Sequence, residues 1–207
     1  MSELPSDRDL MGLPLRAIVA YAVRNARRVQ PRFALWLWGS QPTPDARHLT
    51  ALESAISMAE QFAMGQDRTA AEFEDGIEAA NRAARHASEQ SAAFAASTAA
   101  HSAHAAAYSL RTARAAARYA NPSPHETFPA PDTVAIMAAH AAAAALHAGA
   151  LADAATSDYR RLMQGENGRY PELGTPVDPG EMGALGTLWP AGAPEWYRAG
   201  NSAGVAK

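Results

Sequence analysis

Residues 69–120 decide the fold, and they read TAAEFEDGIEAANRAARHASEQSAAFAASTAAHSAHAAAYSLRTARAAARYA. The stretch contains no proline, and 22 of its 52 residues are alanine, the strongest helix former. We therefore predict one continuous helix, which at about 1.5 Å per residue would be roughly 75 Å long. A chain organised around such a helix is predicted to be all-α.

A heptad-like seam can be followed along this stretch in alternating steps of four and three residues. Such a repeat is typical of coiled coils. Alanine also occurs off the seam, so the pattern is permissive, and Gly76 and the scattered serines are places where the helix could kink. The seam positions are Phe73, Ile77, Ala80, Ala84, Ala87, Ser91, Phe94, Thr98, His101, Ala105, Tyr108, Thr112, Ala115 and Tyr119.

Three further helices are indicated by their boundaries. A proline at each end bounds a helix over residues 14–30, which the second proline ends or bends. Thr43 as N-cap, followed by Pro44 and Asp45 in the first turn, and Gly65 at the C-terminal end bound a second helix over residues 44–64. Asp132 begins a third, over residues 132–164, which ends at a glycine.

Four prolines in residues 121–131 predict a loop. Because this loop joins the helices predicted at 69–120 and 132–164, we expect those two to form a long antiparallel hairpin. Alanine faces let helix axes approach closely but bury little apolar area per residue. We therefore expect a helical bundle over residues 1–165 that needs cover from other parts of the chain or from a partner.

Residues 166–207 differ in composition, with glycine and proline between scattered large apolar residues and no helical period. We interpret them as an extended C-terminal strap with a mobile tail. Two interpretations of its large side chains stay open. They either fill grooves on the bundle, or form a linear motif that docks into a partner or a second copy. The candidate partner-binding residues are Leu188, Trp189, Trp196 and Tyr197.

Composition excludes several kinds of chemistry. The chain has no cysteine, so a disulfide framework, a thiol nucleophile and an iron–sulfur cluster are excluded. Its one lysine, Lys207, is the last residue, which argues against a Schiff-base enzyme or a phosphate-loop lysine. The G-x-S-x-G match beginning at Gly200 leaves no room for the helix that a nucleophile elbow needs. We predict no catalytic residue and no cofactor.

Arginine is concentrated near the N-terminus, and Arg24, Arg27 and Arg28 lie off the apolar stripe of the helix predicted at 14–30. Together with Arg32, and with Trp36 and Trp38 nearby, these arginines could bind phosphate backbones. A solvated charged face is the simpler interpretation. The net charge of -3 and pI near 6.2 also make nucleic acid an unlikely partner.

Histidines offer the one candidate metal site. His101 and His104 lie one turn apart, and the hairpin register should place His104 level with His147. Three imidazoles could hold a divalent metal ion. The alternative is that these histidines are solvated or bonded to neighbouring serines.

Three blocks of sequence resemble bacterial hypothetical proteins of uncharacterised, alanine-rich helical families. They are residues 15–29 (LRAIVAYAVRNARRV), residues 51–65 (ALESAISMAEQFAMG), and the tail segments LGTPVDP at 173–179 and LWP at 188–190. The resemblance implies a bacterial, helical protein, and it supplies neither an activity nor site residues.

The expected function is that of a non-enzymatic helical module for protein–protein interaction or assembly, either self-associating or binding another protein. The alternative is a bundle that binds a metal or a small ligand through the histidines. The most apolar window, residues 134–152, is mostly alanine with two histidines, so no membrane span is expected. We expect a cytoplasmic protein.

Overall fold

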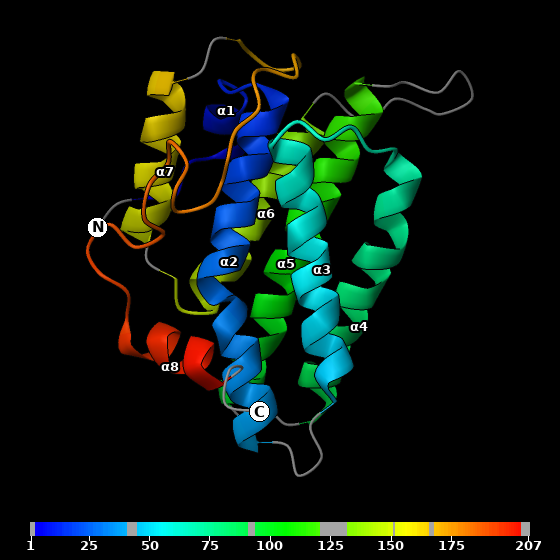
Figure 1. The fold of residues 1–207 in the computed structure, drawn as a ribbon, viewed down its shortest axis with the longest axis vertical. Helices are drawn as coiled ribbons and strands as arrows, with labels where there is room; N and C mark the ends of the chain where they lie inside the picture. Colours follow the sequence, from blue (N-terminus) through cyan, green and yellow to red (C-terminus); the bar gives the residue numbers. More distant parts are fainter. Residues whose placement is uncertain are drawn as a thin grey trace.

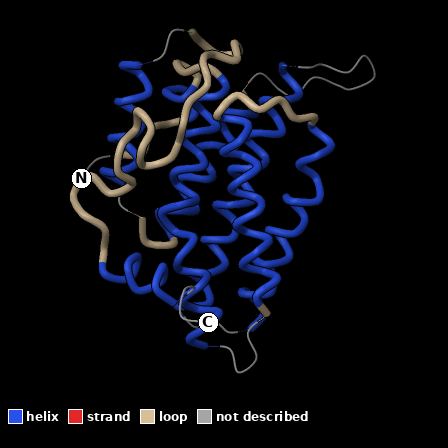
Figure 2. Tube along the Cα trace, viewed as in Figure 1, coloured by secondary structure: helices blue, strands red, loops and turns tan. Residues whose placement is uncertain are grey.

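The computed structural model describes residues 3–40, 45–90, 94–120, 132–150, 152–165 and 168–203. In these ranges the chain forms helices, turns and loops and no strand, and the helices pack around one continuous apolar core (Figures 1 and 2). This confirms the predicted all-α bundle.

The first long helix continues further than the sequence indicates. After a single turn, α1 (Asp7–Leu10), the chain forms α2 (Leu15–Ser40), which runs through Pro31, so the expected end at residue 30 is wrong. A proline inside a helix costs about 3 kcal/mol, because it lacks the N–H donor and clashes with the preceding turn. The helix tolerates that cost because its apolar face is buried on both sides of Pro31.

The second predicted helix is confirmed with small changes at its ends. It is α3 (Ala46–Ala63), and the Asp45 side chain accepts a hydrogen bond from the first turn at the Arg47 N–H. The chain leaves α3 through Gly65, whose positive φ of 96° suits glycine. Arg27 of α2 joins the two helices by bonding Glu60 at 2.6 Å.

Residues 69–120 do not form one helix, so the prediction of a continuous 75 Å rod is wrong. They form the short 3₁₀ turn η1 (Ala70–Phe73), then α4 (Glu74–Gln90) and α5 (Phe94–Ala120). α4 packs back along α5, where Asn81 accepts a hydrogen bond from Arg111 at 3.4 Å. Folding back buries alanine faces that a single rod would leave in water, and it divides the heptad seam between two helices.

α5 is the central helix of the bundle and packs against α2, α3, α4 and α6 (Figure 1). Its alanines make this possible, because small side chains let several helix axes approach at once. Gly76 of α4 shows how tight this packing is. A Cβ placed there would lie 2.4 Å from the end of Met58 and 2.7 Å from that of Leu110, side chains of α3 and α5.

The stretch expected to form one helix over 132–164 is divided into α6 (Thr133–His147) and α7 (Ala152–Gly165). α6 packs along α5, so the predicted hairpin is confirmed for this half. Gly149, with φ 99°, ends α6 by a Schellman-type pair of hydrogen bonds. The chain then changes direction, and α7 lies against α2 instead of continuing along α5.

The C-terminal strap crosses α2 and α7 and ends in a further helix, α8 (Glu195–Ala203), that the sequence interpretation missed. Loop residues at the start of the strap accept hydrogen bonds from the N-terminal N–H groups of α2, including Leu15 N–H to the Glu172 carbonyl at 2.8 Å. α8 packs across α2, and Gly200 allows this because its α-carbon faces the Pro31 backbone closely. Residues 204–207 of the predicted mobile tail lie outside the described ranges.

Among the described residues, no helix combines the length and the apolar character needed to cross a membrane.

Candidate functional site

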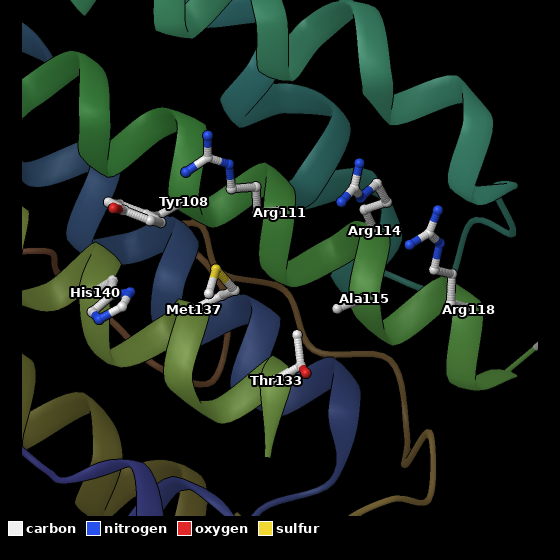
Figure 3. Close-up of a pocket in the computed structure, with 8 residues that line it drawn as sticks. All are labelled: Tyr108, Arg111, Arg114, Ala115, Arg118, Thr133, Met137 and His140. Carbon is white, nitrogen blue, oxygen red and sulfur yellow. The ribbon is translucent and has the colours of Figure 1, made fainter. Parts of the chain in front are cut away.

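A groove between α5 and α6 is lined by arginines from α5 and by aromatic side chains from both helices (Figure 3). The α5 residues follow steps of three and four, so they share one face of that helix, and the α6 residues do the same. The lining consists of Tyr108, Arg111, Arg114, Ala115 and Arg118 from α5, and Thr133, Met137 and His140 from α6.

The groove encloses about 390 Å³ and is open to solvent along one side. Figure 3 shows the three arginines along α5 and the shorter side chains of Thr133, Met137 and His140 along α6. Tyr108 and His140 meet at one end, where their ring centroids lie 5.2 Å apart. The site therefore has a cationic wall, an aromatic end and an apolar patch at Met137.

Neighbouring side chains hold two of the three arginines in place. Arg111 donates to Asn81 at 3.4 Å, and its guanidinium carbon lies 5.1 Å from the centre of the Tyr108 ring. Arg114 forms an ion pair with Glu74, which reaches over from α4. These contacts limit the side-chain freedom of two arginines before any ligand binds, which lowers the entropic cost of binding.

The charged side chains that line the groove are all arginines, and the carboxylate of Glu74, which pairs with Arg114, lies outside the lining. A guanidinium presents a planar fork of donors that matches a carboxylate or a phosphate. The Met137 side chain and the Tyr108 ring offer apolar contact beside those donors. This combination suits an anionic group carried on an apolar stem.

The predicted histidine site is not formed as expected. The His147 ring lies against that of His101, with centroids 5.1 Å apart. The His104 ring lies beside that of Tyr108, at 6.5 Å between centroids. The hairpin register is thus displaced by one turn from the predicted one. Among the described residues, no three histidine, aspartate or glutamate side chains are placed to hold a metal together, so the predicted three-imidazole set is wrong.

The four strap residues expected to bind a partner pack on this chain instead. Leu188 and Trp189 are buried, and the Trp189 ring makes edge contacts with Trp196 and Tyr197 at 5.8 Å and 5.4 Å. The guanidinium of Arg32 stacks over Trp196 at 4.0 Å. These contacts favour the groove-filling interpretation for Leu188 and Trp189, while Trp196 and Tyr197 are half-buried.

Two arginines expected on the outer face of the first helix are fully buried. Arg24 and Arg28 both bond the Asp158 carboxylate of α7, and all three side chains are completely excluded from solvent. Burial lowers the pKa of Arg28 despite its contact with Asp158. These side chains are not available to a phosphate backbone, which corrects the nucleic-acid interpretation.

The same two guanidiniums also hold the strap. Arg24 donates to the carbonyls of Pro179, Gly186 and Thr187 at 2.8–2.9 Å, and Arg28 donates to the Leu188 carbonyl at 2.8 Å. Buried donors and acceptors are thereby satisfied together. The arginines of α2 are structural parts of the fold.

Sequence reasoning overlooked the arginines of the groove, although a signal was present. Arg111, Arg114 and Arg118 are spaced by three and four residues, and Tyr108 precedes them by three. That spacing places them on one helical face. The signal was hidden because the same stretch was interpreted through its alanine seam, and the arginines lie on the neighbouring face of the helix.

Comparisons with known proteins add no family and no relative. No protein-family model matches the chain, and searches of curated proteins and of solved structures also return no match. The resemblance to alanine-rich bacterial proteins therefore stays a prediction.

Proposed function

We propose that this protein is a non-enzymatic protein-interaction module, and that its α5–α6 groove binds an acidic segment of a partner protein. The observation that carries the proposal is the lining of the groove, in which three guanidiniums stand on one helical face with no carboxylate among the lining residues. We assign binding and no reaction to the groove, since its side chains offer charge and apolar contact.

The spacing of the arginines favours an extended acidic segment. Arg114 and Arg118 lie one turn apart on α5, which is about 6 Å along the helix axis. Alternate side chains of an extended peptide repeat every ~6.5–7 Å on the same face. Two carboxylates on alternate residues can therefore reach both arginines.

The partner proposed is a different protein with an acidic segment. A second copy of this chain is a further possible source of carboxylates, because Glu72, Asp75 and Glu78 are exposed near the start of α4. Self-association, coiled-coil packing and a cytoplasmic location stay predictions from the sequence.

Binding of a synthetic peptide tests the proposal. The probe is a labelled peptide in which glutamate alternates with threonine, and its control has glutamine at each glutamate position. We expect the acidic peptide to bind the wild-type protein and the amide peptide to bind far more weakly. Arg111→Gln and Arg118→Gln should each weaken binding about tenfold, because a charge-assisted hydrogen bond contributes ~1.5–3 kcal/mol.

Arg85→Gln is the matched control, since Arg85 is an exposed arginine of α4 that pairs with Glu78 at 2.8 Å and does not line the groove. Equal loss of binding in this variant would show a non-specific charge effect and would contradict the proposal. Binding of citrate, a small anion without a peptide backbone, is measured as a second comparison. If citrate binds as tightly as the peptide and needs the same arginines, the groove is a site for small anions and the interaction function is wrong.

A further inference from the structure

Two histidines on neighbouring helices lie close together and are not among the residues that line the groove. His101 on α5 and His147 on α6 have ring centroids 5.1 Å apart, with their planes inclined by 36°. His147 is exposed and His101 is half-buried, so the pair is accessible from solvent. We propose that His101 and His147 together bind one divalent transition-metal ion such as Zn²⁺, with water in the remaining coordination positions.

The separation of the rings matches a shared metal ion. Imidazole nitrogens bind Zn²⁺ at about 2.0–2.1 Å with tetrahedral angles, which places the centroids of two imidazoles on one ion roughly 5 Å apart. The two side chains therefore need little movement of the helices to converge on an ion. Because they come from the two arms of the α5–α6 hairpin, a bound ion would link those helices.

Hydrogen bonding sets the free nitrogen of His101. Its Nδ1 lies 2.8 Å from the Ser97 carbonyl oxygen, which can only accept, so Nδ1 carries the proton and donates. The lone pair is then on Nε2, on the other side of the ring. Metal-binding histidines in proteins are commonly oriented by this kind of bond from the second ring nitrogen to a carbonyl.

The C-terminal end of α6 favours a bound cation electrostatically. His147 is the last residue of that helix, where unpaired carbonyl groups give the helix terminus a partial negative charge. A cation near this end is stabilised, and the ion would lie beside it. This contribution is additional to the two nitrogen ligands.

A second histidine pair in the same molecule provides a contrast. His48 and His86 have ring centroids 4.5 Å apart and planes inclined by only 20°, so their rings are stacked. In-plane lone pairs of stacked rings run alongside each other and do not converge on one point. The edge of Trp36 also packs on His86, at 5.7 Å between centroids. This pair is not expected to bind an ion.

Isothermal titration of untagged, metal-free protein with Zn²⁺ and with Cu²⁺ tests the site. We expect one equivalent to bind, with Cu²⁺ tighter than Zn²⁺ as the usual order for nitrogen ligands requires. His147→Asn should weaken binding at least about tenfold, and His101→Asn should do the same. His147 is exposed, so its variant tests the site without disturbing the core.

His48→Asn and His86→Asn are the matched controls and should keep wild-type affinity. The proposal is overturned if His147→Asn binds the metal as tightly as the wild type, or if the His48 and His86 variants lose binding instead. Circular dichroism of each variant confirms that the fold is kept. Failure of this site would leave the groove proposal intact, because peptide binding is measured on metal-free protein and depends on the arginines.

Discussion

Asp158 is the only carboxylate bonded to Arg24 and Arg28 among the described residues, and all three side chains are sealed from water. A buried ion pair gains little over a well-packed apolar pair, because both charges lose their hydration. Removing one partner is strongly destabilising, because the remaining charge stays buried without a counter-charge. Here two guanidiniums depend on one carboxylate.

Replacing Asp158 with asparagine should therefore destabilise the protein strongly. Asp158→Asn keeps the size of the side chain but leaves two buried cations close together, and we expect the free energy of unfolding to fall by about 3–5 kcal/mol. Urea denaturation followed by circular dichroism measures this change. Glu78→Gln, which removes an exposed carboxylate paired with Arg82 and Arg85, should change stability far less. Similar losses in both variants would contradict the buried-pair account.

Tyr21 makes stability depend on alkaline pH. Burial raises the pKa of its phenol well above the ordinary value near 10, only partly opposed by Arg28. Above pH 10 the unfolded chain releases this proton while the folded chain retains it, so the free energy of unfolding falls as pH rises. Tyr170, whose pKa burial also raises, adds a second such contribution.

Tyr21→Phe removes the first contribution. We expect its stability to decline less steeply than that of the wild type above pH 10, by up to about 1.4 kcal/mol per pH unit. Urea unfolding at several pH values from 8 upward measures the two slopes. Parallel slopes for the wild type and the variant would show that Tyr21 does not contribute.

At the scale of helices, the sequence predicted that a region is helical better than it predicted where each helix begins and ends. The C-terminal end of α3 could be predicted because Gly65 acts locally, through its positive φ, whereas the N-cap is Asp45 and not the Thr43 expected from the sequence. The division of residues 69–120 could not, because alanine favours a helix equally well on either side of a turn. α2 likewise continues through Pro31 for a reason outside the local sequence, namely burial against neighbouring helices.

Gly149 decides where α6 ends, and its replacement tests that role. Its φ of 99° is unfavourable for any residue with a Cβ, and a Cβ there would lie 3.0 Å from Arg32 Nη2. We expect Gly149→Ala to lower the free energy of unfolding by about 1–2 kcal/mol. Gly39→Ala is the control, because Gly39 lies in α2 with no atom within 4 Å of the added methyl group.

The control should be neutral or stabilising by up to about 1 kcal/mol, since alanine is the better helix former. Denaturation curves of the two variants are compared directly with that of the wild type. If Gly149→Ala were as stable as Gly39→Ala, the left-handed turn would not be what separates α6 from α7.

At the scale of the whole molecule, α5 has two distinct roles. Its alanine faces are buried against four neighbouring helices, and its remaining face carries the arginines of the groove. The need for cover could be predicted from the alanine content. The cover itself could not, because part of it comes from α4 folding back onto α5. The strap that crosses α2 and α7 is held by Arg24 and Arg28, and no local pattern marks these arginines as buried.

Glu74 connects the groove to the rest of the bundle and should limit binding. Its carboxylate pairs with Arg114 from α4, so it competes with an acidic ligand for that guanidinium. We expect Glu74→Gln to bind the acidic peptide several-fold more tightly than the wild type, measured by fluorescence anisotropy. Asp75→Asn removes the same charge from the same turn of α4 without a contact to Arg114 and should change affinity little. Equal gains in both variants would indicate a long-range charge effect only.

Mapping the acidic peptide by NMR tests the central claim most directly. Amide shifts of the uniformly labelled protein are followed as the glutamate–threonine peptide is added. We expect the largest changes around the groove, at Tyr108, Arg111, Arg118, Thr133 and His140. Changes centred on α8 and the strap, or none at saturating peptide, would contradict a protein-interaction site between α5 and α6.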